Sequence, residues 1–463
     1  TLSGDVDVTT LAVGNTVANL AFTGNGSTVT NDIDFANDGT LTLGTSGGTQ
    51  TYNGGLDTSG VGSTVTLNGT IATSNDAVTF GAVTLGSATT IDTNASNTTG
   101  DIAIGAVTGG SNNLTLTTGD NVANSDITAS GAISGLGNLT LADVGGTATF
   151  SANVAAAALS ADSTVANLVF TGASNTFSAA STLANDGTLQ FGDATGDSFT
   201  FNGGLTTSDV GGTVTLNTSI STSNDALVFG AITLGNNITL DTNATNTTGD
   251  LTIGAVTGGS NTLTLTTENN IANADITASG AISGVTTLTI SNAGGTATLS
   301  GDVDVTTLTI GNTVANVAIN GDGSTVTNDI DFANDGTLQL GDATGDTLTF
   351  NGGLDTSDVG GTVTLNGTID TSNDAITFGA VTLGSATTID TNATNTTGDL
   401  TIGAVTGGSN ALTLSMGNNV ANTDISATGN ISGVTTLTLQ NVGGTATLSG
   451  DVDVTTLAVG NTV

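Results

Sequence analysis

The sequence predicts an all-β fold, a right-handed parallel β-solenoid (β-helix) in which short strands stack coil upon coil. Three observations predict it. The 463-residue chain is a tandem repeat with a period of about 149 residues. Inside each repeat, strand-like segments alternate apolar and polar residues and end at Gly, Asn or Asp. The composition, with 68 Gly, 3% aromatic residues and no Pro or Cys, favours stacked coils with small side chains.

The repeat is defined by motifs that recur at a constant phase. The motif ANDGTL begins at Ala36, Ala184 and Ala333, and the first seventeen residues return unchanged from Thr447. The chain therefore divides into repeat 1 (1–148), repeat 2 (149–297), repeat 3 (298–446) and the start of a fourth repeat (447–463), which we expect to form one continuous solenoid. The segment that begins at Gly44 in repeat 1 aligns with the one that begins at Gly192 in repeat 2, but it is one residue shorter. A length change at this point predicts a loop.

The strands inside each repeat are expected to be half-buried. Segments such as TLTLG from Thr40 and AVTLG from Ala82 place apolar residues on one face and Thr on the other. With roughly 20–25 residues per coil, about six coils fit one repeat. The predicted interior includes residues from all three repeats, namely Leu41, Leu43, Leu189, Phe191, Leu338 and Leu340. The alternative fold is a tandem array of antiparallel β-sandwiches.

The charge excludes several classes of function. The chain has 39 acidic residues and no Lys, Arg or His, so its formal net charge is −39. No cation is present to neutralise nucleic-acid phosphates, and no apolar run is long enough to span a membrane. No basic segment followed by an apolar one is present, so we expect any signal peptide to lie outside this sequence. The 39 negative charges repel one another, so we expect salt or divalent cations to stabilise the fold.

Several segments resemble the repetitive passenger regions of large bacterial surface proteins, the autotransporter and two-partner-secretion adhesins and related β-strand-repeat proteins. The resemblance rests on NDGTLTLG from Asn37, ISGVTTLTL from Ile431 and GGTATLSGDV from Gly443, and it covers the whole chain. It implies a non-enzymatic, extracellular structural or adhesive protein of a bacterial cell surface, either a rigid stalk or a subunit of a filament or sheath. Self-association, surface glycans and neighbouring cells are the partners expected.

Paired carboxylates are the only catalytic groups that the composition offers. Such pairs could hydrolyse glycosides on a β-helix, which is the remote alternative function. In repeat 2 the corresponding positions carry Asn153, Ala155, Ala180 and Thr182, and the chain has a single Tyr to stack against a sugar, so we expect no enzyme activity. The pairs are Asp5 and Asp7, Asp32 and Asp34, Asp302 and Asp304, and Asp329 and Asp331.

Calcium is a possible ligand, although no cofactor is expected to be required. The segment DTNASNTTGD from Asp92 recurs as DTNATNTTGD from Asp241 and Asp390 and offers the hard oxygen ligands that calcium takes. The alternative is a turn in which Asn and Asp side chains bond their own backbone. The candidate ligands are Asp92, Asp101, Asp241, Asp250, Asp390 and Asp399.

Flat rows of threonine could also bind ice. Thr64 and Thr66 in repeat 1 correspond to Thr213 and Thr215 in repeat 2 and to Thr362 and Thr364 in repeat 3. We expect these residues to form one row across the repeats, although Gln190 and Gln339 replace Thr42 at equivalent positions. An ice-binding surface module is therefore a second alternative, beside a calcium-dependent one.

Overall fold

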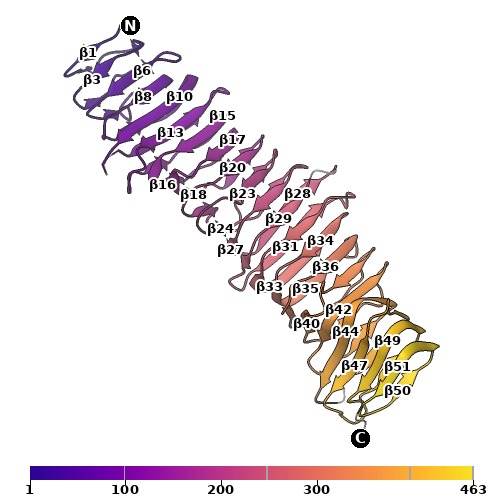
Figure 1. Cartoon of the computed structure of the whole chain (residues 1–463). Helices are drawn as coiled ribbons and strands as arrows, with labels where there is room; N and C mark the ends of the chain where they lie inside the picture. The colour runs from indigo at the N-terminus through magenta and orange to yellow at the C-terminus, as the bar shows by residue number, and fades with distance from the viewer. Residues whose placement is uncertain (98–99, 247–248, 396–397, 461–463) are drawn as a thin grey trace. The chain divides into compact units, whose positions relative to one another are not determined.

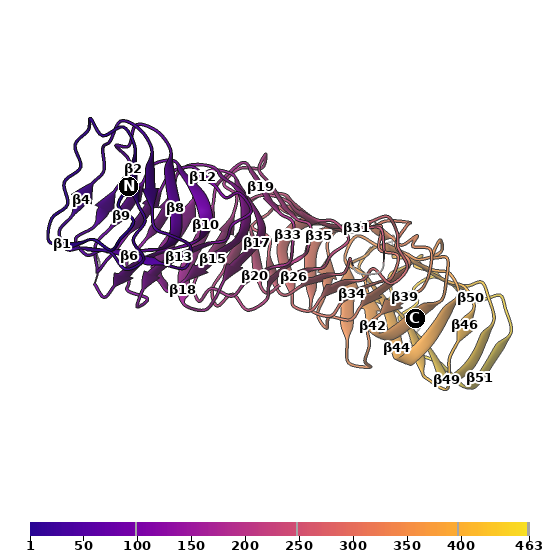
Figure 2. The same cartoon turned by 90° about the horizontal axis from the view of Figure 1, so that it is seen from above.

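The computed structural model describes residues 1–97, 100–246, 249–395 and 398–460, and within these ranges it contains no helix. It divides into two compact units, Thr1–Ser223 and Asn224–Val463. In each unit, short strands lie side by side in a stack (Figures 1 and 2). The boundary between the units falls inside repeat 2, so the continuity of the solenoid across it stays a prediction.

Unit 1 is a stack of three-sided coils. The chain meets the three sides in the order β5, β6 and β7, and the long strands β8, β10, β15 and β17 continue from the first side round a corner to the second. The strands of the first side are β2 (Leu20–Phe22), β5 (Leu41–Leu43), β8 (Val65–Ala72), β10 (Val83–Ala95), β12 (Val107–Thr108), β15 (Ile133–Ala142), β17 (Val154–Ala161), β19 (Ser174–Phe177), β22 (Ser198–Phe201) and β25 (Ile220–Thr222). Those confined to the second side are β1 (Asp7–Val8), β3 (Thr28–Val29), β6 (Thr49–Tyr52), β13 (Leu114–Gly119), β20 (Ser181–Leu183) and β23 (Leu205–Thr207). Those of the third are β4 (Ile33–Asp34), β7 (Leu56–Asp57), β9 (Val78–Phe80), β11 (Ile102–Ile104), β14 (Ile127–Ala129), β16 (Val144–Phe150), β18 (Val165–Phe170), β21 (Leu189–Phe191) and β24 (Val214–Leu216).

Unit 2 has the same three-sided plan, and its sides are named in the order β26, β27 and β28. Some strands turn a corner. Among them, β42, β44 and β49 begin on the first side and continue onto the second, and β33 and β35 begin on the second and continue onto the third. The first side holds β26 (Leu227–Phe229), β29 (Leu251–Ile253), β32 (Ile276–Ala278), β34 (Thr296–Leu299), β36 (Asn316–Ile319), β39 (Leu338–Leu340), β42 (Val363–Asp370), β44 (Val381–Ala393), β46 (Val405–Thr406), β49 (Ile431–Gln440) and β51 (Val452–Val459). The second holds β27 (Ile232–Leu234), β30 (Val256–Thr257), β33 (Ile282–Ser291), β35 (Val303–Ile310), β37 (Thr325–Val326), β40 (Thr347–Phe350) and β47 (Leu412–Gly417). The third holds β28 (Ile238–Ala244), β31 (Thr262–Glu268), β38 (Ile330–Asp331), β41 (Leu354–Asp355), β43 (Ile376–Phe378), β45 (Leu400–Ile402), β48 (Ile425–Ala427) and β50 (Ala446–Leu448).

Successive coils pair in parallel and in register, although the coils differ in length. Val65 pairs with Val83 across a short coil, whereas Val107 pairs with Ile133 across a longer one. All described strand pairs are parallel, so the parallel β-solenoid is confirmed and the antiparallel sandwich alternative is wrong. The stack is consistent with the right-handed β-helix that the sequence predicts.

The core lies inside the coils and is built from the predicted residues. Leu41, Leu43, Leu189, Phe191, Leu338 and Leu340 are all fully buried. In unit 1, phenylalanines of successive coils stack along the third side. The ring centroids of Phe150 and Phe170 lie 4.9 Å apart, and those of Phe170 and Phe191 lie 6.1 Å apart. Inward positions therefore form columns of mostly apolar side chains, which stabilise each coil against the next.

Polar side chains at the corners link one coil to the next. The backbone N–H of Thr40 donates to the Asn19 side chain of the previous coil at 3.1 Å, and Thr188 and Thr337 make the same bond in their repeats. The coils approach closely here, because a Cβ on Gly39 would lie 1.5 Å from the carbonyl oxygen of Ala18. The Asn and Gly residues that mark the ends of strands in the sequence thus join coils as well as turning the chain.

The predicted loop is confirmed at the one-residue slip between repeats. Residues 44–48 connect β5 to β6, and residues 192–197, one residue longer, connect β21 to β22. A Cβ added at Gly47 or at its counterpart Gly196 would meet no atom within 4 Å. The tip of the loop therefore has open space around it, which explains why a length change is accommodated there.

A repeat does not contain a whole number of coils. From Leu41 on the first side, six register steps lead through Val65, Val83, Val107, Ile133 and Val154 to β19. The copy of Leu41 is Leu189, which lies two sides further on, in β21 on the third side. The prediction of about six coils is confirmed, and the repeat measures six coils plus two of the three sides.

Each step of one repeat therefore moves a segment back by one side. In unit 1, β6 on the second side has its copy, β22, on the first side. Unit 2 shows the same shift independently, because β27 on its second side has its copy in the first half of β44, on the first side. The repeats thus follow one another with a rotation of one third of a turn.

This rotation makes the predicted threonine row across repeats wrong. Thr66 lies on the first side of unit 1, in register with Thr42 and Thr84, whereas its copy Thr215 lies on the third side, in register with Gln190. Hydroxyl columns do form, but within one side and from different positions of the repeat. Ice binding by such a column stays a prediction.

One buried hydroxyl has no hydrogen-bond partner and recurs in each repeat. Thr58 is 1% exposed, and the strand register places it between Phe35 and Phe80 of the flanking coils. Its Oγ1 atom accepts and donates no hydrogen bond, and the same holds for the copies Thr207 and Thr356. An unpaired buried hydroxyl lowers stability because it has lost its hydrogen bonds to water.

We predict that Thr58→Val stabilises the protein, by about 1 kcal/mol, because valine keeps the shape and removes the unpaired hydroxyl. The matched control is Thr73→Val, since the Thr73 hydroxyl donates to the carbonyl oxygens of Asp76 and Thr93. Thermal unfolding should show a higher Tm for the first variant and a lower Tm for the second. Equal losses in both variants would contradict this account of Thr58.

Candidate functional site

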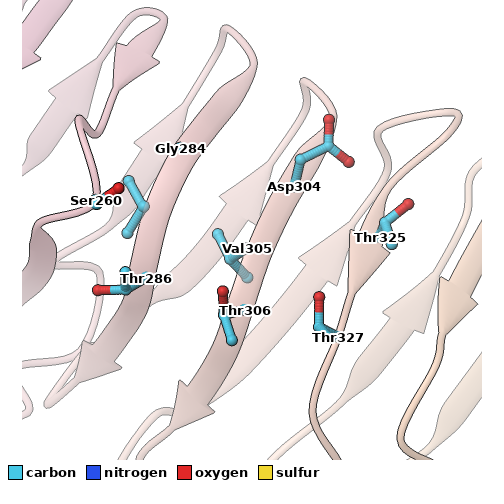
Figure 3. Close-up of a pocket in the computed structure, with 9 residues that line it drawn as sticks. Ser260, Gly284, Thr286, Asp304, Val305, Thr306, Thr325 and Thr327 are labelled. Atoms are coloured by element: carbon cyan, nitrogen blue, oxygen red, sulfur yellow. The ribbon is translucent and has the colours of Figure 1, made fainter.

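Unit 2 contains a polar groove beside a bulge in β33. The register with β35 shifts between Ser283 and Val285, and Gly284 at the shift has φ 67°. A left-handed residue in a strand bends it away from its neighbour, and glycine adopts this conformation without steric cost. The bend opens a groove of about 420 Å³ across β33, β35 and β37 (Figure 3).

The groove is lined by hydroxyls and one carboxylate. Asp304 and Thr325 are register partners and project from neighbouring strands (Figure 3). Val285 and Val305 are 2% and 4% exposed and form the floor. The remaining polar lining consists of Ser260, Thr286, Thr306 and Thr327. This set can exchange hydrogen bonds with a polar surface, and Asp304 is the one carboxylate among the residues that line it.

The groove recurs where the sequence repeats. A counterpart of about 210 Å³ lies between β49 and β51 and is lined by Ser409, Gly433 and Asp453 among others. In unit 1, Asp7, Thr28 and Thr30 line a related groove. At the start of repeat 2, however, Ala155 replaces the aspartate. The sequence patterns did not predict this groove, although the isolated Gly inside the strand pattern ISGV is a signal for a bulge.

Several carboxylates of the acid pairs proposed for glycoside hydrolysis accept backbone hydrogen bonds or face other acids. Asp5 accepts a hydrogen bond from the Gly26 N–H at 2.8 Å, and Asp7 accepts one from Thr28 at 3.1 Å. Asp34 is in register with Asp57 of the next coil, as Asp331 is with Asp355. Partial burial, followed by the carboxylates of Asp355, Asp358 and Asp329, raises the pKa of Asp331.

No aromatic side chain is exposed anywhere in the part of the chain that the structure describes. Tyr52, the only tyrosine, is fully buried, where its hydroxyl donates to Gln50 at 3.0 Å and burial raises its pKa. A sugar-binding cleft usually stacks its ligand on such a ring. The described surface therefore lacks the stacking platform that the glycosidase alternative requires.

The six calcium candidates each accept a backbone hydrogen bond. Asp92, Asp241 and Asp390 accept from the residue two positions later, at 2.8, 2.8 and 2.9 Å. Asp101, Asp250 and Asp399 accept from the N–H of an aspartate in the next coil, at 2.9, 3.1 and 2.9 Å. The contacts of Asp92, Asp241 and Asp390 match the capped-turn interpretation, whereas those of Asp101, Asp250 and Asp399 link adjacent coils. Within the repeated segment, residues 98–99, 247–248 and 396–397 lie outside the described residues.

The described residues contain no group of three or more acidic side chains arranged to hold a metal ion. The acidic neighbours also differ among repeats. Asp92 faces Asp120 and Asp143, whereas its copy Asp241 faces Glu268. Calcium binding at these turns stays a prediction.

Among these aspartates, Asp241 has the most strongly raised pKa. Partial burial, together with the nearby carboxylate of Glu268, raises the pKa of Asp241 to about 6, while a hydrogen bond from the Asn243 backbone opposes the shift. Burial also raises the pKa of Asp92 and of Asp370, the latter beside Asp390. Ionising such a carboxyl destabilises the folded chain, because no cation offsets it.

The fold defines a class, a parallel β-solenoid built from tandem repeats. No protein-family model, curated protein or solved structure matches this chain. Over the residues described, none forms a helix with the length and apolar character needed to cross a membrane.

We predict that Asp241→Asn stabilises the protein at neutral pH. The folded pKa lies above the ordinary value of 3.8, so the folded state retains a proton that the unfolded chain releases, and stability falls as the pH rises from about 4 to about 6. Asparagine keeps the oxygen that accepts from Asn243 and abolishes this fall.

Unfolding midpoints measured from pH 4 to pH 8 test the prediction. Glu268→Gln should act in the same direction, because it removes the facing carboxylate. The control is Asp335→Asn on the exposed surface, which should leave the change of the unfolding midpoint with pH as it is in the unsubstituted protein. If the Asp241→Asn variant loses as much stability between about pH 4 and about pH 6 as the unsubstituted protein does, the loss does not arise from Asp241.

Proposed function

We propose that this chain is a non-catalytic structural repeat protein of a bacterial cell surface, acting outside the cell as a stalk or as a subunit of a filament or sheath. One observation carries the proposal. In both units the feature that the coils share is their attachment to the next coil, by backbone pairing and by corner side chains. Asn19 and Asp101 are examples of corner side chains that make these attachments.

Further features of the chain support exposure outside the cell. The absence of Lys and Arg leaves no cleavage site for trypsin-like proteases in the sequence. The outward positions are rich in Thr and Ser, as along the first side of unit 1 at Thr42, Thr66 and Thr84, and so present a neutral hydrogen-bonding surface. Such a surface suits contact with surface glycans or a neighbouring cell.

The proposal predicts that antibodies against this chain label intact, unpermeabilised cells of the source organism. A cytoplasmic protein of the same cells serves as the control and should stay unlabelled until the cells are permeabilised. Labelling of this chain only after permeabilisation would contradict the surface assignment. Negative-stain images of the purified protein then separate the two roles, because a stalk remains a single particle and a filament subunit polymerises.

The charge supports a second prediction about conditions. With a formal charge of −39 and no internal cation, we expect added NaCl to raise the Tm by screening repulsion. Calcium at matched ionic strength should add an increment through a few weak sites at the turns of Asp92, Asp241 and Asp390, and a chelator should remove only that increment. A Tm that is the same in chelator, NaCl and millimolar calcium would show that charge does not limit this fold.

A further inference from the structure

We propose that each repeat is a module that rotates the next copy by one third of a turn about the solenoid axis. The number of copies then sets the direction in which a given surface points as well as the length of the solenoid. The inference goes beyond the proposed function and does not depend on where the protein is located. It follows from the mismatch between the repeat and the coil.

The shift of one side per repeat can be followed at a single loop. Residues 44–48 join β5 on the first side to β6 on the second, so the loop leaves the corner between these sides. Its copy, residues 192–197, joins β21 on the third side to β22 on the first, and so leaves an adjacent corner. Two copies of one sequence thus project in directions a third of a turn apart.

The same rotation moves the polar groove in unit 2. The groove with Asp304 lies where β33 and β35 occupy the second side, in register with β30 and β37. Its copy with Asp453 lies where β49 and β51 occupy the first side, in register with β46. Any partner that recognises this groove meets it on a different face in the next repeat.

The fold also permits the number of repeat copies to change, because residues that pair between coils are separated by only one coil of sequence. Described register partners lie only one coil apart, so a coil contacts residues of its own repeat or the adjoining one. If residues 149–297 were removed, Thr298 would meet Thr128 in place of its present partner Thr277. Likewise Leu308 would meet Leu139 in place of Leu288. Each new partner is the same residue type as the old one, so the stack can close.

The rotation is tested first in the full chain, by inserting a small folded tag after Ser46 and a second after Thr195. Both sites lie in loops where Gly47 and Gly196 have open space around them. Class averages of negatively stained particles should show two tags about 32 Å apart along the axis, given coils spaced about 4.8 Å, and on different sides of the stack. Two tags on one line parallel to the axis in every view would overturn the proposal.

The modular claim is tested by a deletion of residues 149–297, with tags after Ser46 and Thr344. Repeat 3 then takes the place of repeat 2, so the two tags should show the same separation and the same third-of-a-turn angle as in the full chain. The matched control deletes residues 149–286, about half a coil less, and should lose its cooperative melting transition because the register is broken. An in-phase deletion that melts no better than this control would overturn the proposal.

Discussion

Within each unit, the described coils are held to their neighbours by parallel backbone hydrogen bonds, and this pairing constrains all other features. Register fixes which residues face inward, because a slip of one residue would turn Leu41 and Leu43 outward and Thr42 inward. Since the same register continues from strand to strand in each unit, inward positions become columns and must hold side chains that pack on one another. The phenylalanines of β16, β18 and β21 and the leucines of β5 and β8 follow this requirement.

The corners carry the second constraint, because the backbone leaves the strand pairing there and its N–H groups need other partners. Asn and Asp side chains supply these partners from the previous coil, as Asn19 does for Thr40 and Asp101 for Asp126. This role explains how a chain with no cation uses many carboxylates without forming ion pairs.

The fold and the core could be predicted from the sequence because alternation and stacking leave local patterns, and the loop after Gly44 could be predicted from a single length change. The rotation of the repeats could not, because it is the accumulated remainder of coils of unequal length, which no local pattern marks. The threonine row through Thr66 and Thr215 failed for this reason. At the candidate sites, the six aspartates were found by residue type, but their hydrogen bonds to the backbone depend on which coil lies beside them.

The central claim, in-register parallel stacking, is tested most directly by paired cysteine substitutions, since the chain contains no cysteine of its own. Thr66→Cys with Thr84→Cys joins register partners of adjacent coils, whose Cα atoms in a parallel sheet lie about 4.8 Å apart, within disulfide range. We predict that this pair, and Gln190→Cys with Thr215→Cys, cross-link under mild oxidation. Thr66→Cys with Thr215→Cys should not, because these copies lie on different sides. Cross-linking of the copies, without cross-linking of the register partners, would contradict the account.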